Sequence, residues 1–148
     1  MAEIKLARGD RDGAIAALTS LVALNENDDA ARLLLASLLE ARGQADQALA
    51  MLDSAVFIYP FDPALHERRA ALATRLGKPV EVIDARRAIV ALDPVDKAEA
   101  YFQLALAELE VGDRPAAKRS VLRSLEIAPR FERAQELLLR IHREEKIP

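Results

Sequence analysis

The chain has 148 residues, about the size of one domain, and a formal net charge of −3. Apolar residues make up 51% and aromatic residues only 4%, a composition that favours close-packed helices over sheets. The charges are interspersed and no long apolar run occurs, so we expect neither a nucleic-acid nor a membrane partner. The absence of cysteine excludes thiol chemistry. No export signal is visible in this chain, which leaves the compartment open with the cytoplasm as the default.

Turn residues recur along the chain with a nearly constant period. Four glycines are spaced 34, 34 and 35 residues apart: Gly9, Gly43, Gly77 and Gly112. Three prolines keep the same interval: Pro60, Pro94 and Pro129. A fixed period in this range is typical of stacked repeats. The sequence therefore predicts an all-α fold, an α-solenoid of antiparallel helix pairs with about 3.5–4 repeat units.

The first repeat, predicted over residues 1–28, is incomplete. Residues Ala2 to Arg8 span about half the helix expected before Gly9, and no polar cap precedes them. Two interpretations stay open: the chain starts inside a repeat of a longer protein, or a shortened first helix is tolerated. The polar loop over residues 25–29 either caps the next helix or recruits a cation, and capping is the interpretation that we favour.

Three complete repeats and a capping helix are predicted to follow, over residues 29–62, 63–97, 98–131 and 132–146. In the second repeat, Leu34, Leu35, Leu38 and Leu39 share one helix face, and Gly43 ends that helix. An apolar stripe then begins again and continues until the proline of the repeat. The last helix is apolar on one face and charged on the other, as the end of a solenoid requires for solubility.

These positions resemble the tetratricopeptide repeat, a helix–turn–helix unit of about 34 residues. The second repeat matches at eight signature positions: Leu35, Ala36, Leu39, Gly43, Ala48, Leu52, Ala55 and Pro60. The third repeat departs from the pattern, with Arg69 and Arg86 at nominally buried positions and Val82 where a small residue is usual. We expect both arginines to reach solvent or to pair with Asp84 or Glu67. The alternative is that the third repeat is locally looser or contacts an acidic partner.

The stretch from Ala91 to Leu138 also resembles, less specifically, the C-terminal repeat segment of large bacterial proteins with a zincin-type metallopeptidase upstream. His66 and Glu67 begin like a zinc-peptidase helix, but the second histidine four residues on is missing. Any catalysis that this resemblance implies would therefore lie outside this chain. For the chain itself we expect no catalytic residue, no metal and no cofactor.

The tetratricopeptide resemblance implies a non-catalytic scaffold that binds a peptide or protein segment on its concave face. In the family the first helix of each repeat lines that face, which gives these candidates here: Leu33, Ser37, Glu40, Glu67, Arg68, Arg75, Phe102, Gln103 and Leu106. Arg68 and Arg75 lie two turns apart on one face and would hold an acidic peptide, unless Glu40 and Glu67 already pair with them.

One branch of the family clamps the C-terminal carboxylate of heat-shock chaperones with Lys and Asn at set positions. Here those positions hold Leu33, Ser37 and Ala64, and only Arg68 fits, so we expect no such clamp. Two alternatives to the peptide-binding scaffold stay open. One is a regulatory or targeting appendage of a metallopeptidase, and the other is a structural module that self-associates through its open N-terminal edge.

A second candidate surface surrounds Pro60. Phe57, Tyr59 and Phe61 lie within five residues, and the first two take places that the family usually fills with charged residues. Exposed aromatic side chains of this kind mark an interface. The alternative is that they fold over the start of the third repeat.

Overall fold

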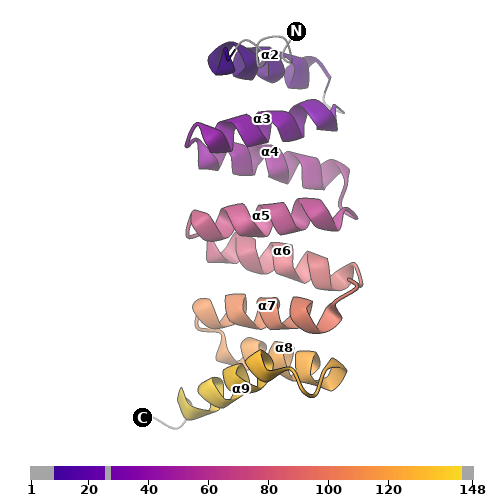
Figure 1. Ribbon diagram of the computed structural model, residues 1–148, viewed down its shortest axis with the longest axis vertical. Coiled ribbons are helices and arrows are strands. Elements are labelled where there is room, and N and C mark those ends of the chain that lie inside the picture. The colour runs from indigo at the N-terminus through magenta and orange to yellow at the C-terminus, as the bar shows by residue number, and fades with distance from the viewer. Residues whose placement is uncertain (1–8, 26–27, 145–148) are drawn as a thin grey trace. The chain divides into compact units, whose positions relative to one another are not determined.

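The computed structural model describes residues 9–25 and 28–144. Over these residues the chain forms eight helices and no strand, which confirms the predicted all-α class (Figure 1). It divides into two compact units, Met1–Leu72 and Ala73–Pro148, and each is described by itself. Among the described helices, none combines the length and the apolar character needed to cross a bilayer. The half-helix predicted over Ala2–Arg8 lies outside the described residues.

The first unit contains α2 (Arg11–Leu24), α3 (Asp29–Ala41), α4 (Ala45–Ile58) and most of α5 (Pro63–Arg75). Helix α3 packs against both α2 and α4, and α2, α3 and α4 alternate in direction along the chain (Figure 1). Helix α4 ends two residues before Pro60, where the sequence predicts the stop.

The second unit contains α6 (Pro79–Ala91), α7 (Lys97–Glu110), α8 (Arg114–Ile127) and α9 (Glu132–Glu144). Each of these helices packs against the next one in sequence. Helix α9 begins at the residue predicted for the capping helix.

The glycine turns account for the sequence period. After α3, the backbone of Gly43 takes a φ of 80°, a left-handed conformation that costs other residues about 1–2 kcal/mol. It lets the Gly43 N–H donate to the Glu40 carbonyl at 3.0 Å and the Gln44 N–H to the Leu39 carbonyl at 2.9 Å. The same pair of hydrogen bonds follows α7, where Gly112 has a φ of 81°. The turn glycines therefore repeat because the same helix end recurs.

Aspartates cap the N-terminal ends of four helices, two of which follow a glycine turn. The side chain of each accepts a hydrogen bond of 2.8–3.0 Å from the backbone N–H three residues on, as an N-cap does: Asp10, Asp28, Asp96 and Asp113. Asp28 lies in the polar loop that was expected to cap a helix, and it caps α3. Asp62 accepts instead from the Ala64 N–H, at 2.9 Å, at the start of α5.

Small side chains recur at two buried positions of the repeat. The alanines at the repeat positions of Ala36 and Ala48 have no exposed surface: Ala14, Ala36, Ala48 and Ala70 in the first unit and Ala105 and Ala117 in the second. The absence of side-chain atoms beyond Cβ lets two backbones approach closely. Val82, the larger residue at one of these positions, is buried as well.

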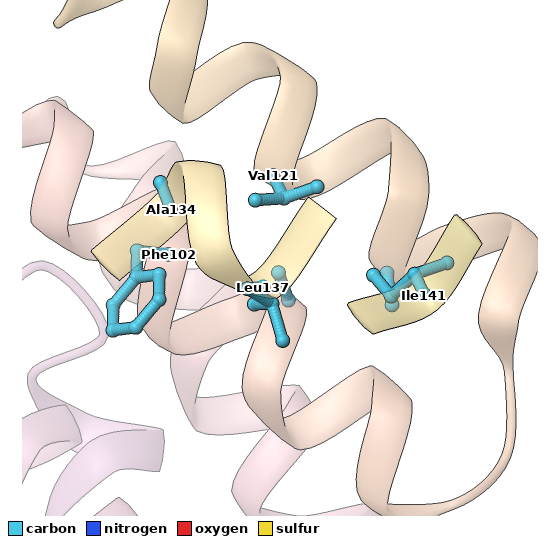
Figure 2. Close-up of a cluster of buried hydrophobic side chains, with 7 residues drawn as sticks. Phe102, Val121, Ala134, Leu137 and Ile141 are labelled. Carbon is cyan, nitrogen blue, oxygen red and sulfur yellow. The ribbon is translucent and has the colours of Figure 1, made fainter. Parts of the chain in front are cut away.

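Helix α9 closes the core of the second unit. Its buried residues Ala134, Leu137 and Ile141 lie against Phe102 of α7 and Val121 of α8 (Figure 2). The residues on its other side are exposed, including Leu139, Arg140 and Arg143. Helix α9 therefore seals the apolar face that α7 and α8 leave open, as a capping helix should.

Replacing Gly43 with alanine tests the turn. No atom lies within 4 Å of where the new Cβ would sit, so the substitution adds backbone strain without a clash. We expect Gly43→Ala to lower the free energy of unfolding by about 1–2 kcal/mol, measured by urea denaturation. The control Gln47→Ala, at an exposed position in α4, should change it by less than about 0.5 kcal/mol. Equal effects of the two substitutions would contradict the strain argument.

Candidate partner-binding surfaces

In the first unit, Arg68 of α5 gathers three of the predicted site residues of α3. Its Nη2 lies 2.8 Å from Oε1 of Glu40 and donates at 2.8 Å to the Ser37 hydroxyl. Its Nη1 donates to the Leu33 carbonyl at 3.4 Å, and its Nε to Glu40 at 3.2 Å. The prediction that these residues share a surface is thus consistent with the structure, but the guanidinium is already bound.

The contacts of Arg68 decide whether its charge is available to an acidic peptide or is already paired with Glu40. Both side chains of the Arg68–Glu40 pair are partly buried, with 31% and 21% of their surface exposed. A partner carboxylate would have to displace Glu40 and leave that carboxylate without its cation, which is costly at a partly buried site. The charge of Arg68 is therefore paired with Glu40, which is one of the two alternatives given from the sequence. Glu67 and Arg75 are exposed on the same helix.

Arg69 has a partner that sequence reasoning did not name. Its Nε lies 2.5 Å from Oδ1 of Asp53 on α4, and the arginine side chain is 16% exposed. The sequence analysis expected Arg69 to reach solvent or to pair with Asp84 or Glu67. The ion pair with Asp53 joins two neighbouring helices, and Arg69 is tolerated at a nominally buried position because its charge is paired there.

In the second unit, Phe102 is a core residue. Only 5% of its surface is exposed, and its ring lies 5.1 Å from that of Phe131, centroid to centroid, at 59°. Its predicted place on an exposed binding face therefore does not agree with its burial under α9. Gln103 and Leu106, the other two candidates on α7, are half-buried.

Arg133 at the start of α9 covers these two aromatic rings. Its guanidinium lies 4.9 Å from the Phe102 centroid and 5.0 Å from the Phe131 centroid, which is the geometry of a cation–π contact. It also pairs with Glu99 at 2.5 Å, and Glu99 accepts from the Gln103 amide at 2.7 Å. Four contacts thus hold a charged and aromatic cluster between α7 and α9.

Three adjoining hollows follow the line between α7 and α9. The first, of about 640 Å³, lies at the start of both helices and is lined by Glu99, Phe131 and Arg133 among others. The second, of about 310 Å³, shares Arg133 with the first and adds Leu106 and Arg140. The third, of about 320 Å³, again includes Leu106 and Arg140. Because they share lining residues, we treat them as one surface and call it the α7/α9 groove.

The α7/α9 groove has an apolar floor and charged edges. Leu106 and Leu137 lie along the floor, beside the largely buried ring of Phe102. Charged residues of both signs border it: Arg130, Arg133, Arg140, Asp96, Glu99, Glu110 and Glu136. Such a surface suits an amphipathic segment, whose apolar side chains would lie on the floor and whose charged groups would reach the edges.

Sequence reasoning missed the half of this groove that α9 provides, because it treated α9 only as a cap. The repeat period carries the signal. Arg133 follows Glu99 by 34 residues, and both Leu137 after Gln103 and Arg140 after Leu106 keep the same distance. Helix α9 therefore occupies the position that the first helix of a further repeat would take, and its side chains face α7 accordingly.

The aromatic residues around Pro60 are exposed. Phe57 and Phe61 keep 88% and 83% of their surface and Tyr59 keeps 45%. The alternative that the two phenylalanines fold over the start of α5 therefore does not agree with the structure.

The other polar candidates serve packing. His66 is buried, and its Nε2 lies 2.8 Å from the Pro60 carbonyl, to which the ring N–H donates. The buried Ser124 hydroxyl donates to the Ala98 carbonyl at 2.7 Å. Over the described part of the chain, no group of three or more His, Cys, Asp or Glu residues is placed to hold a metal ion.

Paired helices, glycine turns, buried alanines and a capping helix together define a helical-repeat protein. Residues 5–72 match the family model described as Tetratricopeptide repeat, which confirms the resemblance found in the spacing. No curated protein matches the sequence.

Solved structures share the fold over most of the chain. A crystal structure of MamA is 22% identical, with a TM-score of 0.68, and the match covers 98% of this chain and 84% of that one. YrrB, described as a TPR protein with an unusual peptide-binding site, is 15% identical with a TM-score of 0.69 and coverages of 98% and 74%. The first TPR of Spaghetti (RPAP3), solved with the HSP90 peptide SRMEEVD, is 22% identical with a TM-score of 0.61 and coverages of 80% and 94%. At these identities the likeness is one of fold.

A double-mutant cycle tests the engagement of Arg68. We expect Arg68→Met and Glu40→Gln to show a coupling of about 0.5–1.5 kcal/mol in the free energy of unfolding, because the pair is partly buried and hydrogen-bonded. The matched control is the Arg123–Glu126 pair, whose side chains are 66% and 60% exposed. Its coupling should stay below about 0.5 kcal/mol. A coupling for Arg68–Glu40 no larger than that of the control would show that Arg68 is not held.

Proposed function

We propose that this chain is a non-catalytic protein-interaction scaffold and that it binds an amphipathic peptide segment in the α7/α9 groove. The observation that carries the proposal is the continuity of the three hollows, with Leu106 and Leu137 on the floor and charged residues along both edges. A surface of this length and chemistry can bury several apolar side chains of a segment while its polar groups stay hydrated.

The cluster around Arg133 favours a defined binding mode. Arg133 is held by Glu99 and by two aromatic rings, so its side chain loses little conformational entropy when a ligand binds. Arg130 and Arg140 are exposed on the same side. Acidic side chains of a bound segment would approach Arg130 and Arg140, whereas Arg133 is already paired with Glu99. We therefore expect a ligand with apolar residues at helical or alternating spacing, flanked by acidic ones.

The structures with a similar fold support a peptide-binding role for this chain. They do not indicate which of its residues would contact the peptide. The RPAP3 structure was solved with a bound peptide, and YrrB is described as having a peptide-binding site. In the first unit of this chain, the predicted basic surface is weakened because Arg68 is bound to Glu40 and Ser37. The proposal therefore assigns the primary peptide site to the second unit. Of the predicted residues on α7, Leu106 lines the groove, and Gln103 donates a hydrogen bond to Glu99 at its edge.

The chaperone peptide SRMEEVD provides a negative test. Leu33 and Ala64 offer no amine or amide to a terminal carboxylate, and Arg68 is already engaged. We expect no binding of SRMEEVD tighter than about 1 mM by isothermal titration calorimetry. An affinity in the low micromolar range would contradict this interpretation, and its loss in Arg68→Met would place the peptide in the first unit.

Selection from a random peptide library displayed on phage tests the groove itself. The immobilised full chain is the bait, and the affinities of synthetic copies of selected peptides are measured by fluorescence polarisation. We expect Arg140→Glu and Leu106→Ser each to weaken binding by about tenfold or more, because the first reverses an edge charge and the second removes an apolar contact of the floor.

Two control substitutions lie outside the groove. Leu139→Ser changes an exposed apolar side chain of α9, and Arg123→Glu reverses an exposed charge on α8. Both should leave the affinity within about twofold, and circular dichroism should show that all four variants are folded. Selected peptides that bind the groove variants and the parent chain equally would overturn the proposal.

A further inference from the structure

The first unit has a hollow of its own, on a surface that the proposed function does not use. It measures about 700 Å³ and is bordered by Val22 and Ala23 at the end of α2 and by Ser54 and Phe57 near the end of α4. This volume is within the range of about 300–1,000 Å³ typical of ligand pockets. Both helices follow a turn glycine, Gly9 or Gly43, whereas the groove proposed above lies along α7 and α9.

Large apolar side chains project beside this hollow. Phe57 lies on its rim with 88% of its surface exposed, and Leu24, one residue beyond the α2 wall, is 87% exposed. Soluble monomers seldom leave such side chains next to an apolar depression, because covering them removes apolar surface from water. This surface therefore carries both a projecting side chain, the Phe57 ring, and a recess, the hollow beside it.

We infer that this surface binds a second copy of the chain, with Phe57 of each copy entering the hollow of the other. A two-fold interface requires one patch to be complementary to itself, and a patch that carries both the projection and the recess meets that condition. A second copy of the chain supplies both features at once, so each ring and each recess would be covered in the dimer.

The charges around the hollow permit this pairing. Its charged lining residues are Arg32 and Asp53, which have opposite signs. Arg32 is only 5% exposed, and the Asp53 carboxylate is paired with Arg69 at 2.5 Å. The exposed rim is otherwise apolar or uncharged. Two copies facing each other would therefore bring no block of like charge together, which a strongly acidic or basic rim would do.

Analytical ultracentrifugation of the full chain, from about 1 µM to about 1 mM, tests the inference. We expect the weight-average mass to rise from one to two chain masses. Phe57→Ser removes the projection and Ser54→Arg places a charge in the recess, and each should raise the dimer dissociation constant by about tenfold or more. Val95→Arg, at a fully exposed position outside this unit, is the control and should change it by less than twofold.

Each other outcome overturns the inference. A chain that stays monomeric throughout this range has no such interface. A dimer that survives both Phe57→Ser and Ser54→Arg, in variants shown to be folded, associates through another surface, such as the N-terminal edge.

Discussion

Close approach of paired helices is the constraint on which the rest of this structure depends. At the repeat positions of Ala36 and Ala48 the described residue is alanine in all but one case, and these alanines are fully buried. A larger side chain at such a crossing would push the backbones apart and shift every residue further along the pair. The glycine turn then reverses the chain within a few residues. These two features together explain why the period stays at 34 or 35 residues.

The candidate groove is a consequence of the same packing. Helix α9 seals the α7–α8 pair and so takes the place beside α7 that another first helix would hold. Its buried face supplies Leu137, and residues at the edge of that face, Arg133 and Arg140, reach the hollows beside α7. A capping helix here both protects the core and completes the surface proposed to bind a ligand. Stability and function of the second unit are therefore linked through α9.

The sequence predicted the features that depend on local physical chemistry. Gly43, Asp28 and Pro60 mark helix ends through backbone conformation and capping, and those effects involve only a few neighbouring residues. The crossing alanines were predicted because the repeat period places them one above another. The all-α class follows from these features together.

The sequence did not predict which residues meet across helices. The pairing of Arg69 with Asp53 depends on how α5 is rotated against α4, which no spacing within either helix determines. Phe102 has the pattern of a groove residue, but α9 covers it. The site residues of α9 were missed because a cap was not expected to bind, although the 34-residue spacing from Glu99 to Arg133 contains the information.

The central claim is that a ligand binds between α7 and α9. The most direct test is two-dimensional NMR of the isotopically labelled full chain, titrated with a peptide selected from the library. The account predicts that the largest chemical-shift changes occur at Leu106, Arg133, Leu137 and Arg140. Changes confined to α2–α4, or to the exposed face of α8 around Leu122 and Arg123, would contradict it.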